Sequence, residues 1–394
     1  MRIAIVHDWL ATYAGSERVL EQMLLCLPDA DLFSLVDFLG RERAFLQNKS
    51  VTTSFIQKLP FARRGFRNYL LLMPLAIEQF DLSNYDVVIS NSHAVAKGVV
   101  TGPDQIHISY VHSPMRYAWE LQHQYLAESG LSKGVRSWVA RWVLHKLRLW
   151  DHRTSNGVDA FIANSMFIAR RVRKTYGREA EVIYPPVDVN GFQCRSAKED
   201  YYLVVSRIVP YKRVDIVVEA FGRMPEKRLV VLGDGPGLKR LRSIATHNVE
   251  LLGFQPREVV RQFMERAKAF IVMAKEDFGI APIEAQACGT PVIAYRGGGV
   301  AETIRGLECE ESTGILFEEQ SCESLIAAVK RFENVGQRIS PLACRENAER
   351  FREERFRSEF SAFVRQTCLR IQKGRGMMRD LWGQEISKKK RECR

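Results

Sequence analysis

The chain has 394 residues, of which 46% are hydrophobic and 26% are charged, a composition typical of a globular protein long enough for two domains. No apolar run approaches the ~20 residues of a membrane-spanning helix, and MRIAIVHDWL predicts a first strand instead of a signal peptide. The eight cysteines form no C-x-x-C pair, which argues against a disulfide framework or a zinc site and fits a reducing cytosol.

The net charge of +12 predicts attraction to nucleic acid, an anionic membrane surface or phosphorylated ligands. Residues 58–73 and 133–153 combine basic side chains with aromatic and aliphatic ones, and the sequence ends in the basic tail SKKKRECR. Such segments fit a peripheral contact with an anionic membrane, or solvated helix faces whose apolar stripes lie in the core. No recognition module for RNA or DNA is visible, so we expect no nucleic-acid partner.

Short β-rich runs alternate with longer helical patterns, which predicts an α/β fold with parallel sheets covered by helices. The consecutive prolines of IYPPVDVNGF (183–192) mark the joint between two Rossmann-like domains, because they cannot continue a helix or a central strand. We expect domains over 1–186 and 187–365, and a helix end with the basic tail over 366–394. A long helical pattern runs from about 340 to 372. The expected strands are Ile3–Val6, Leu32–Leu35, Thr52–Phe55, Val87–Ser90, Ile108–Val111, Ala160–Ala163, Val182–Tyr184, Tyr202–Ser206, Arg228–Leu232, Val249–Leu252, Phe270–Met273, Val292–Tyr295 and Gly314–Phe317.

Basic side chains and glycines follow the strands of the second half. SRIVPYKR places Arg207 and Lys212 after one strand, where open α/β sheets bind ligands and where the two cations would clamp a diphosphate. GDGP (233–236) and LGFQP (252–256) follow the next two strands, either as ligand-facing loops or as plain turns. RGGGVAET (296–303) is a further glycine turn between a strand and a helix.

The stretch KEDFGIAPIEA carries two carboxylates, Glu276 and Glu284, on either side of an expected helix start. Pro282 suits the first helical position, which places Glu276 in the loop and Glu284 in the first turn. The free N–H groups near 280–283 form an anion site. Carboxylates beside a diphosphate would repel it, so we expect them to accept hydrogen bonds from hydroxyls, one acid for each sugar of a nucleotide-sugar.

In the first half, polar side chains follow the expected strands. His112, in VHSP, ends a strand and is a candidate for the reacting centre, although a structural role alone would also account for it. His7, Asp8 and His93 are further candidates at the cleft edge. Aromatic rings beside polar groups suit stacking on a sugar. The candidates for the acceptor side are Arg116, Tyr117, Trp119 and Glu120.

Five motifs in order, S-R-x3-Y-K-R, G-D-G-P, L-G-F, E-D-F-G-I-A-P-I-E-A and G-T-P-V-I-A-Y-x-G-G, resemble retaining glycosyltransferases of the GT-B fold, family four. The E-x7-E spacing is that family's signature, and the resemblance is specific over about 200–305. HDWLATYAGSERVL (7–20) resembles the family's glycine loop. YVHSPMRYAWE (110–120) resembles the subgroup that includes O-antigen mannosyltransferases. The resemblance covers most of the chain and is weakest at 40–80, 125–155 and beyond 375.

By position, the resemblance implies a catalytic set of His112, Glu276, Arg207 and Lys212. Arg207 and Lys212 would neutralise the diphosphate, Glu284 would hold the ribose and Glu276 the donor sugar. One departure is Ala14, because the family's loop usually reads Gly-Gly at this point. The donor-binding set implied by the resemblance is completed by Gly15, Ser16, Gly233, Gly253, Phe254, Phe278, Gly279, Ile280 and Ala281.

The transition state resembles an oxocarbenium ion leaving an anionic diphosphate, so the site must stabilise departing negative charge. Arg207, Lys212 and the helix terminus do this without a metal or a cofactor. The one D-x-D, at 29–31, is interpreted as a turn. No nucleophile for a covalent glycosyl-enzyme stands out on the acceptor side, which favours front-face attack guided by the leaving phosphate.

We therefore expect a retaining glycosyltransferase that moves a hexose, by resemblance mannose from GDP-mannose, onto a lipid-linked saccharide in bacterial surface polysaccharide synthesis (O-antigen or exopolysaccharide). It would act in the cytoplasm, peripherally on the inner membrane. The alternatives are a UDP-hexose donor, a nucleotide-sugar hydrolase or epimerase of the same architecture, and a non-catalytic binding protein. A dinucleotide oxidoreductase is disfavoured, since no G-x-G-x-x-G opens a helix after the first strand.

Overall fold

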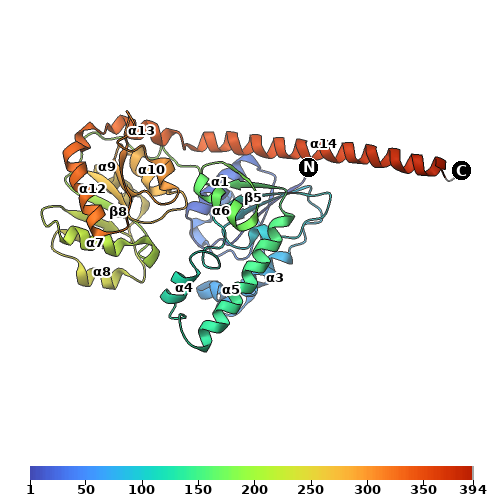
Figure 1. Ribbon diagram of the computed structural model, residues 1–394, viewed down its shortest axis with the longest axis horizontal. Coiled ribbons are helices and arrows are strands. Elements are labelled where there is room, and N and C mark those ends of the chain that lie inside the picture. The colour runs from blue at the N-terminus through green and yellow to red at the C-terminus, as the bar shows by residue number, and fades with distance from the viewer. Residues whose placement is uncertain (393–394) are drawn as a thin grey trace.

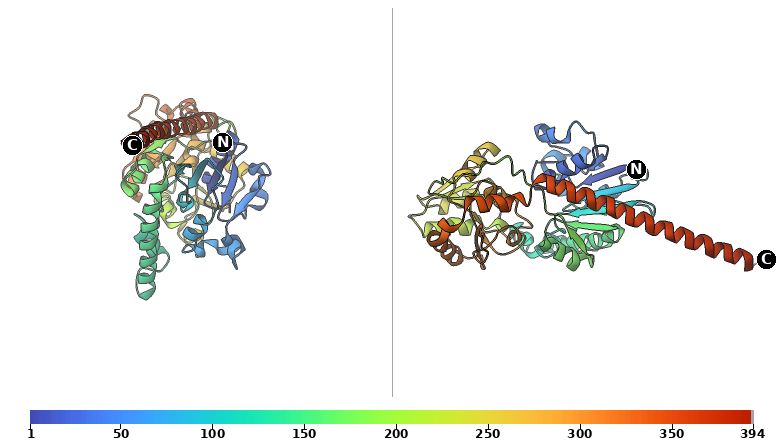
Figure 2. Two further views of the ribbon diagram at one scale, coloured as in Figure 1. Left: turned by 90° about the vertical axis from the view of Figure 1, so that its right-hand side faces the viewer. Right: turned by 90° about the horizontal axis from the view of Figure 1, so that it is seen from above.

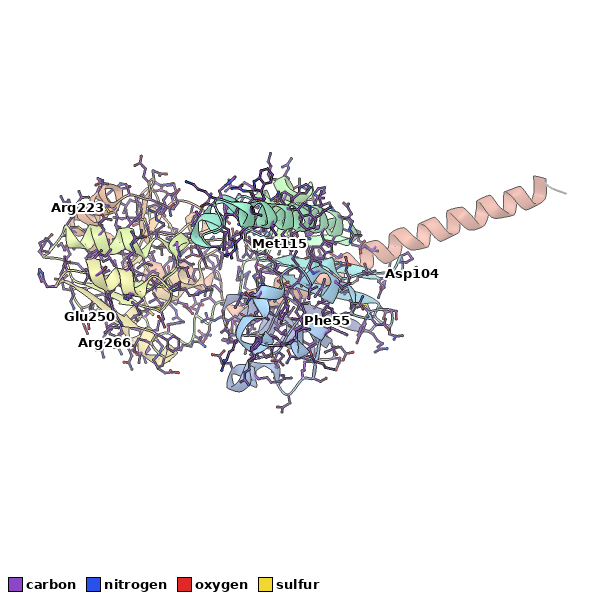
Figure 3. All side chains as sticks on the ribbon, turned by 90° about the horizontal axis from the view of Figure 1, so that it is seen from below. Phe55, Asp104, Met115, Arg223, Glu250 and Arg266 are labelled. Carbon is purple, nitrogen blue, oxygen red and sulfur yellow. The ribbon has the colours of Figure 1, made fainter. Side chains whose placement is uncertain are left out.

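The computed structural model describes residues 1–392, with the side chains of all of these except 41, 337 and 375–392. The chain forms two α/β domains, the first at the right of Figure 1 and the second at the left. Figure 3 shows the same division from below, with Phe55, Asp104 and Met115 labelled in the first domain and Arg223, Glu250 and Arg266 in the second. No helix of the described residues is long and apolar enough to cross a membrane.

Seven parallel strands form the sheet of the first domain, in the order β3-β2-β1-β4-β5-β6-β7. Its central strands are buried along almost their whole length, as in sheets that are covered on both faces. The strands are β1 (Ile3–His7), β2 (Asp31–Ser34), β3 (Val51–Thr53), β4 (Val87–Ser92), β5 (Ile106–Val111), β6 (Ala160–Ala163) and β7 (Ala180–Val182). The helices are α1 (Gly15–Cys26), α2 (Ala62–Gly65), α3 (Met73–Glu78), α4 (Gln122–Glu128), α5 (Val135–Thr154) and α6 (Met166–Tyr176).

The second domain has a six-stranded parallel sheet in the order β10-β9-β8-β11-β12-β13. Its strands are β8 (Tyr202–Val205), β9 (Leu229–Leu232), β10 (Val249–Gly253), β11 (Ala269–Val272), β12 (Val292–Tyr295) and β13 (Gly314–Phe317). Its helices are α7 (Val214–Gly222), α8 (Leu238–Ile244), α9 (Arg257–Arg266), α10 (Ile280–Ala287), α11 (Val300–Thr303), α12 (Cys322–Val335) and α13 (Pro341–Glu349). The last helix, α14, runs from Glu353 to Glu392.

All thirteen strands expected from the sequence are present, which confirms the parallel α/β architecture. The strand expected at Val182–Tyr184 lies earlier, at Ala180–Val182. The prolines at 185 and 186 have no N–H to give a sheet ladder, so pairing stops before them. The strand expected at Thr52–Phe55 ends at Thr53, because Ser54 accepts a hydrogen bond from the Ile56 N–H and starts a short turn.

The helical pattern expected from about 340 to 372 is two helices, α13 and α14, with a break at 350–352. Figure 2 shows α14 leaving the second domain and running back along the first. Phe356, Phe360 and Val364 lie in a buried cluster with the first strands of the chain. The domain bounds remain predictions, but the part of 187–365 that belongs to α14 packs on the first domain.

Each sheet reverses its strand order once, between β1 and β4 and between β8 and β11. In open α/β sheets, the carboxyl-end loops beside such a point form the ligand crevice. His7 is the last residue of β1, and it pairs with Asn91, the last but one residue of β4. Lys212 and Glu276 follow β8 and β11. The expected ligand-binding side chains therefore gather at the two reversal points.

Candidate active site

Lys212 and Glu276 form an ion pair at the carboxyl ends of β8 and β11. The Lys212 Nζ lies 2.5 and 2.7 Å from the two carboxylate oxygens of Glu276, and both side chains are about four-fifths buried. They border a small cavity of about 30 Å³ that the ends of the two strands also line. The structure thus brings together a cation and a carboxylate that the sequence assigned to phosphate and sugar.

Helix α10 starts two residues earlier than the sequence suggested. Its N-terminal cap is Gly279, whose φ of +93° is the left-handed conformation that favours glycine, and Ile280 is the first helical residue. Pro282 is tolerated because N–H groups in the first turn have no helical partner. Glu284 consequently lies in the second turn of α10, not the first. It still sits beside the positive end of this helix.

The glycine cluster at 297–299 supports the Glu276 loop. A Cβ added to Gly298, where φ is +89°, would lie 2.2 Å from the carbonyl oxygen of Glu276. The Gly299 N–H donates to the same oxygen at 2.8 Å. These glycines therefore have a structural reason to be small, since their backbone packs directly against the loop that carries the carboxylate.

The N-terminus of α1 faces that of α10 from the first domain. A Cβ added to Gly15 would lie 3.2 Å from the Ile280 side chain. Ala14 has an extended backbone (φ −137°, ψ −156°) that needs no glycine, so the departure from the family's Gly-Gly pattern costs nothing in backbone strain. The Glu17 carboxylate accepts from the Ala14 N–H and from the Ser16 hydroxyl, both at 3.0 Å, and so caps the helix.

Several side chains cross between the domains. The Arg18 Nη1 of α1 lies 2.5 Å from the Glu284 carboxylate. Asp277 contacts Arg116 at 3.2 Å and Arg171 at 2.8 Å. The Glu302 carboxylate accepts from the first two N–H groups of α6, each at 2.8 Å. The sequence did not single out Arg18, Asp277 or Arg171, because a charged residue gives no local sign of a partner more than a hundred positions away.

A chain of buried hydrogen bonds links His112 to α1 through Asn91. The Asn91 amide nitrogen donates to the Ser16 carbonyl oxygen at 3.0 Å, and a carbonyl can only accept, which fixes the orientation of the amide. That nitrogen also donates to His7 Nδ1 at 3.1 Å, so the proton of His7 is on Nε2, which lies 3.2 Å from Glu17. The Asn91 oxygen accepts from His112 Nε2 at 2.6 Å. His112 is therefore left with Nδ1 as a bare acceptor.

The charge states of His112 and Glu17 follow from burial and from the neighbouring histidines. Burial first, then the charges of His93 and His7, hold the pKa of His112 well below its ordinary value of 6.5, so the ring is neutral. Burial would raise the pKa of Glu17, but the hydrogen bond and the charge of His7, together with the charge of His93, outweigh it and bring the pKa to about 2. A neutral His112 ring matches the proton position on Nε2 that the orientation of the Asn91 amide implies.

Two cleft-edge candidates are largely structural. The Asp8 carboxylate accepts four backbone N–H groups, those of residues 93–96, at 2.5–2.9 Å. His93 lies beside it, with its ring 4.5 Å from that of Trp9, and burial lowers its pKa below 6.5. Asp8 therefore shapes the loop after β4 and has little capacity left for a ligand.

The four acceptor-side candidates divide into two pairs. Arg116 and Glu120 lie at the domain boundary, where Arg116 meets Asp277 and Glu120 meets Arg171. Tyr117 and Trp119 pack against the core cluster of the first domain. Burial raises the pKa of Tyr117, and Trp119 donates its indole N–H to Asp151 at 2.7 Å. The structure brings only the first pair next to the loop that carries Glu276.

The remaining donor-side candidates differ in exposure and in their contacts. Arg207 is exposed and forms no ion pair with a described residue. The Phe278 side chain is buried against Tyr184, which leaves the backbone of 278–281 to face a ligand. Gly233 and Gly253 are joined by a 2.8 Å backbone hydrogen bond, and Phe254 beside them is 77% exposed.

Two family models match the chain in succession. Residues 13–190 match the model described as Glycosyltransferase Family 4, and residues 192–351 match the one described as Glycosyl transferases group 1. An uncharacterized glycosyltransferase of Methanocaldococcus jannaschii is 30% identical over 160 residues, which are 39% of this chain and 45% of that protein. The chain spans about half the length of the curated relatives it matches.

Solved structures are similar over nearly the whole chain. Anabaena Alr3699/HepE in complex with UDP and glucose has a TM-score of 0.66 at 18% identity, over 92% of this chain and 99% of that one. The sucrose-phosphate synthase of Thermosynechococcus elongatus has a TM-score of 0.71 at 16% identity, over 93% and 99%. At these identities the likeness shows the fold alone. It confirms two Rossmann-like domains in the GT-B arrangement.

Proposed function

We propose that this chain, a family-4-like GT-B protein by the models that match its two halves, transfers a hexose from a nucleotide-sugar to a saccharide acceptor. The observation that carries the proposal is the convergence at the reversal points of both sheets. There the N-termini of α1 and α10 meet, Lys212 holds Glu276 and Arg18 holds Glu284. Helix N-termini and cations suit a diphosphate, and carboxylates suit sugar hydroxyls.

Transfer with retention and without a metal is the mechanism that these groups support best. Arg207, Lys212 and the N-terminus of α10 would stabilise the departing nucleoside diphosphate. His112 would accept a hydrogen bond from a hydroxyl of the transferred sugar through Nδ1. Front-face attack would then retain the configuration. If EDTA abolishes activity and Mn²⁺ or Mg²⁺ restores it, the metal-free mechanism is wrong.

GDP-mannose is the donor that the YVHSPMRYAWE segment favours. A UDP-hexose is the second candidate, supported by the UDP and glucose complex of Anabaena Alr3699/HepE. A ligand that binds only the native state raises its stability by about 2.7 kcal/mol at a hundred times its Kd. Thermal unfolding with GDP, UDP, dTDP and ADP, each beside its sugar forms, therefore identifies the donor. If only UDP or its sugars raise the melting temperature, GDP-mannose is not the donor. If none of the nucleotides or nucleotide-sugars raises it, the proposal of nucleotide-sugar binding is wrong.

The proposed acceptor is a lipid-linked saccharide of surface polysaccharide synthesis, met at the cytoplasmic face of the inner membrane. The basic aromatic segments support this, because they carry exposed rings among Lys and Arg. Incubation of the labelled donor with a membrane extract should give a labelled lipid-soluble product. Equal release of free sugar with and without the extract would favour a nucleotide-sugar hydrolase instead.

A further inference from the structure

Helix α5 exposes an apolar face that no other element of the described residues covers. The residues Ser137, Leu144, Leu147 and Asp151 of the opposite face are buried. Side chains spaced three and four apart share one helix face. The exposed face carries Val135, Trp138, Val139, Trp142 and Leu149, which are 80%, 78%, 57%, 58% and 54% exposed. Figures 1 and 2 show the N-terminal half of α5 extending away from the sheet of the first domain.

The charged side chains of α5 before Asp151 are all basic. No Asp or Glu occurs between Glu128 and Asp151, whereas Arg136 and Lys146 are exposed on the same helix as the two tryptophans. The Lys146 ammonium lies over the Trp142 ring, 5.6 Å from its centre. Two like-charged copies of this face would repel each other, but an anionic surface would attract it. Tryptophan and basic side chains on one helix are typical of helices that lie in a membrane interface.

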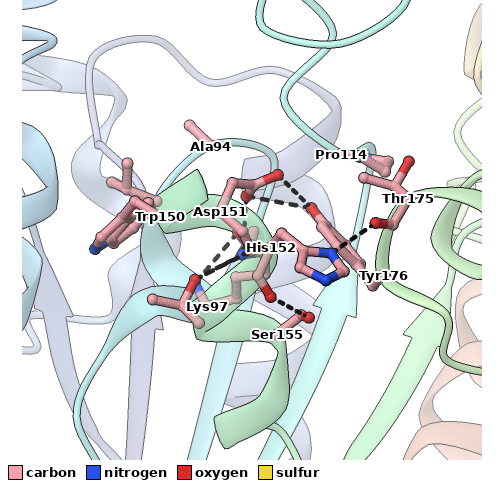
Figure 4. Close-up of polar contacts among 12 residues, drawn as sticks. Ala94, Lys97, Pro114, Trp150, Asp151, His152, Ser155, Thr175 and Tyr176 are labelled. Atoms are coloured by element: carbon pink, nitrogen blue, oxygen red, sulfur yellow. Dashed lines mark hydrogen bonds and ion pairs between the residues drawn. The ribbon is translucent and has the colours of Figure 1, made fainter. Parts of the chain in front are cut away.

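The C-terminal half of α5 is fixed rigidly to the core. The buried Asp151 is paired with the buried Lys97 at 2.8 Å and accepts a hydrogen bond from the Tyr176 hydroxyl (Figure 4). His152 Nδ1 lies 3.0 Å from the Thr175 carbonyl oxygen in the same view. Breaking a buried ion pair such as Lys97–Asp151 costs about 3–5 kcal/mol, so α5 cannot rotate freely relative to the first domain. The exposed half is thus held at a fixed angle to the domain.

The same helix supports the acceptor side of the cleft. Arg148 of α5 donates to the Ala118 carbonyl oxygen at 2.8 Å, and Trp119 donates to Asp151. These contacts hold the loop over 113–121, whose Arg116 reaches Asp277 in the second domain. A surface that binds α5 would therefore lie next to the loop that borders the candidate acceptor site.

The other basic segment, 58–73, behaves similarly. Its Phe66 and Met73 join the buried cluster that contains Leu144 and Leu147 of α5. Its Phe61 remains 83% exposed. These segments therefore place one apolar stripe in the core, as one sequence interpretation has it, and leave other apolar side chains exposed; the membrane contact stays a prediction.

We infer that the exposed face of α5 docks on an anionic lipid bilayer, with Trp138 and Trp142 at the headgroup level and Arg136 and Lys146 against the anionic headgroups. The inference deepens the proposed function, on which it rests for the lipid-linked acceptor, by naming the surface that brings the cleft to that lipid. Binding to vesicles is measured without donor or acceptor, so the two proposals fail separately.

The test is co-sedimentation of the full chain with vesicles of phosphatidylcholine and phosphatidylglycerol, beside vesicles of phosphatidylcholine alone. We expect the double variant Trp138→Ser/Trp142→Ser to lower the partition coefficient on the order of tenfold or more. The matched control is Ile244→Ser/Leu342→Ser, which removes exposed apolar side chains from the second domain and should bind as the unmodified chain does. Far-UV circular dichroism verifies that each variant is folded.

The charge component is tested in the same assay. Arg136→Ser/Lys146→Ser should weaken binding and reduce its sensitivity to salt, whereas Lys239→Ser/Arg242→Ser on α8 should not. Equal binding to both kinds of vesicle, or unchanged binding of the tryptophan variant, would overturn the inference. So would a stable dimer by light scattering that the tryptophan variant converts to monomer, because the face would then belong to a second copy of the chain.

Discussion

Asn91→Asp tests the hydrogen-bond chain that leads to His112. The amide of Asn91 donates to the Ser16 carbonyl and to His7 and accepts from His112, and the residue is fully buried. A carboxylate of the same shape can accept the last of these bonds but can donate neither of the others. The substitution therefore changes the proton positions of two histidines while removing no side-chain volume.

The size of the effect follows from the contact distance. A carboxylate within ~4–6 Å raises the pKa of a neighbouring group by about 1–3 units, and the His112 Nε2 lies 2.6 Å from the replaced atom. The imidazolium has a proton on Nδ1 and no longer accepts a hydrogen bond from the sugar. Losing such a bond between neutral partners costs about 0.5–1.5 kcal/mol, roughly 2–10-fold in kcat.

The assay is kcat against pH, with the donor that thermal unfolding identifies. In the unmodified chain His112 stays neutral, since its pKa lies well below 6.5, so kcat should not fall between pH 8 and pH 6.5 on its account. In Asn91→Asp the pKa of His112 is raised, so kcat should begin to fall at a higher pH than in the unmodified chain and recover as the pH rises through the new pKa. Asn164→Asp is the control, because Asn164 donates to the backbone carbonyl of His112 and not to its ring. A wild-type profile in Asn91→Asp would refute this account of His112.

Three further outcomes are expected. Glu276→Gln and Lys212→Met should each lower kcat by ~100-fold or more while circular dichroism stays unchanged, since each removes one partner of a site that acts on the transition state. Arg18→Met should increase the radius of gyration in X-ray scattering, because it removes a contact that joins the domains. Burial lowers the pKa of His107 to about 4. The unfolded chain already binds that proton at about pH 6.5, so the free energy of unfolding decreases as the pH falls from about 6.5 to about 4, by up to about 1.4 kcal/mol per pH unit. Urea unfolding at pH 7 and pH 5 should show a smaller difference in His107→Gln.

The strands could be predicted because most are short apolar runs that alternate with longer helical patterns. β12 and β13 lie where the sequence placed them, at Val292–Tyr295 and Gly314–Phe317. The course of α14 could not, because Phe356 and Phe360 form an apolar stripe that does not specify which domain covers it. Their partners in the first strands of the chain lie some 350 positions away in the sequence.

The candidate site was predictable where residues follow strands, as with Lys212 and Glu276. The ion pair between Lys212 and Glu276 could not be predicted, because the two residues lie 64 positions apart and only the sheet topology places β11 beside β8. Arg18 is one of many arginines in a helix pattern, and only the fold places it against Glu284. Asp277 was adjacent to a motif residue, yet its two arginine partners come from the other domain.

Because Glu276 and Glu284 are each paired with a cation, pyrophosphate, the nucleoside diphosphate and the nucleotide-sugar should differ in affinity. Lys212 and Glu276 neutralise each other, as do Arg18 and Glu284, which leaves Arg207 as the exposed cation nearby. A diphosphate must draw Lys212 or Arg18 away, and a carboxylate left without a partner in a partly buried site is costly. Hydroxyls can replace the lost cation on each carboxylate, so pyrophosphate should bind weakest, the nucleoside diphosphate more tightly and the nucleotide-sugar tightest. Titration calorimetry measures this series, and pyrophosphate that binds as tightly as the nucleoside diphosphate would show that the carboxylates do not hold the sugars.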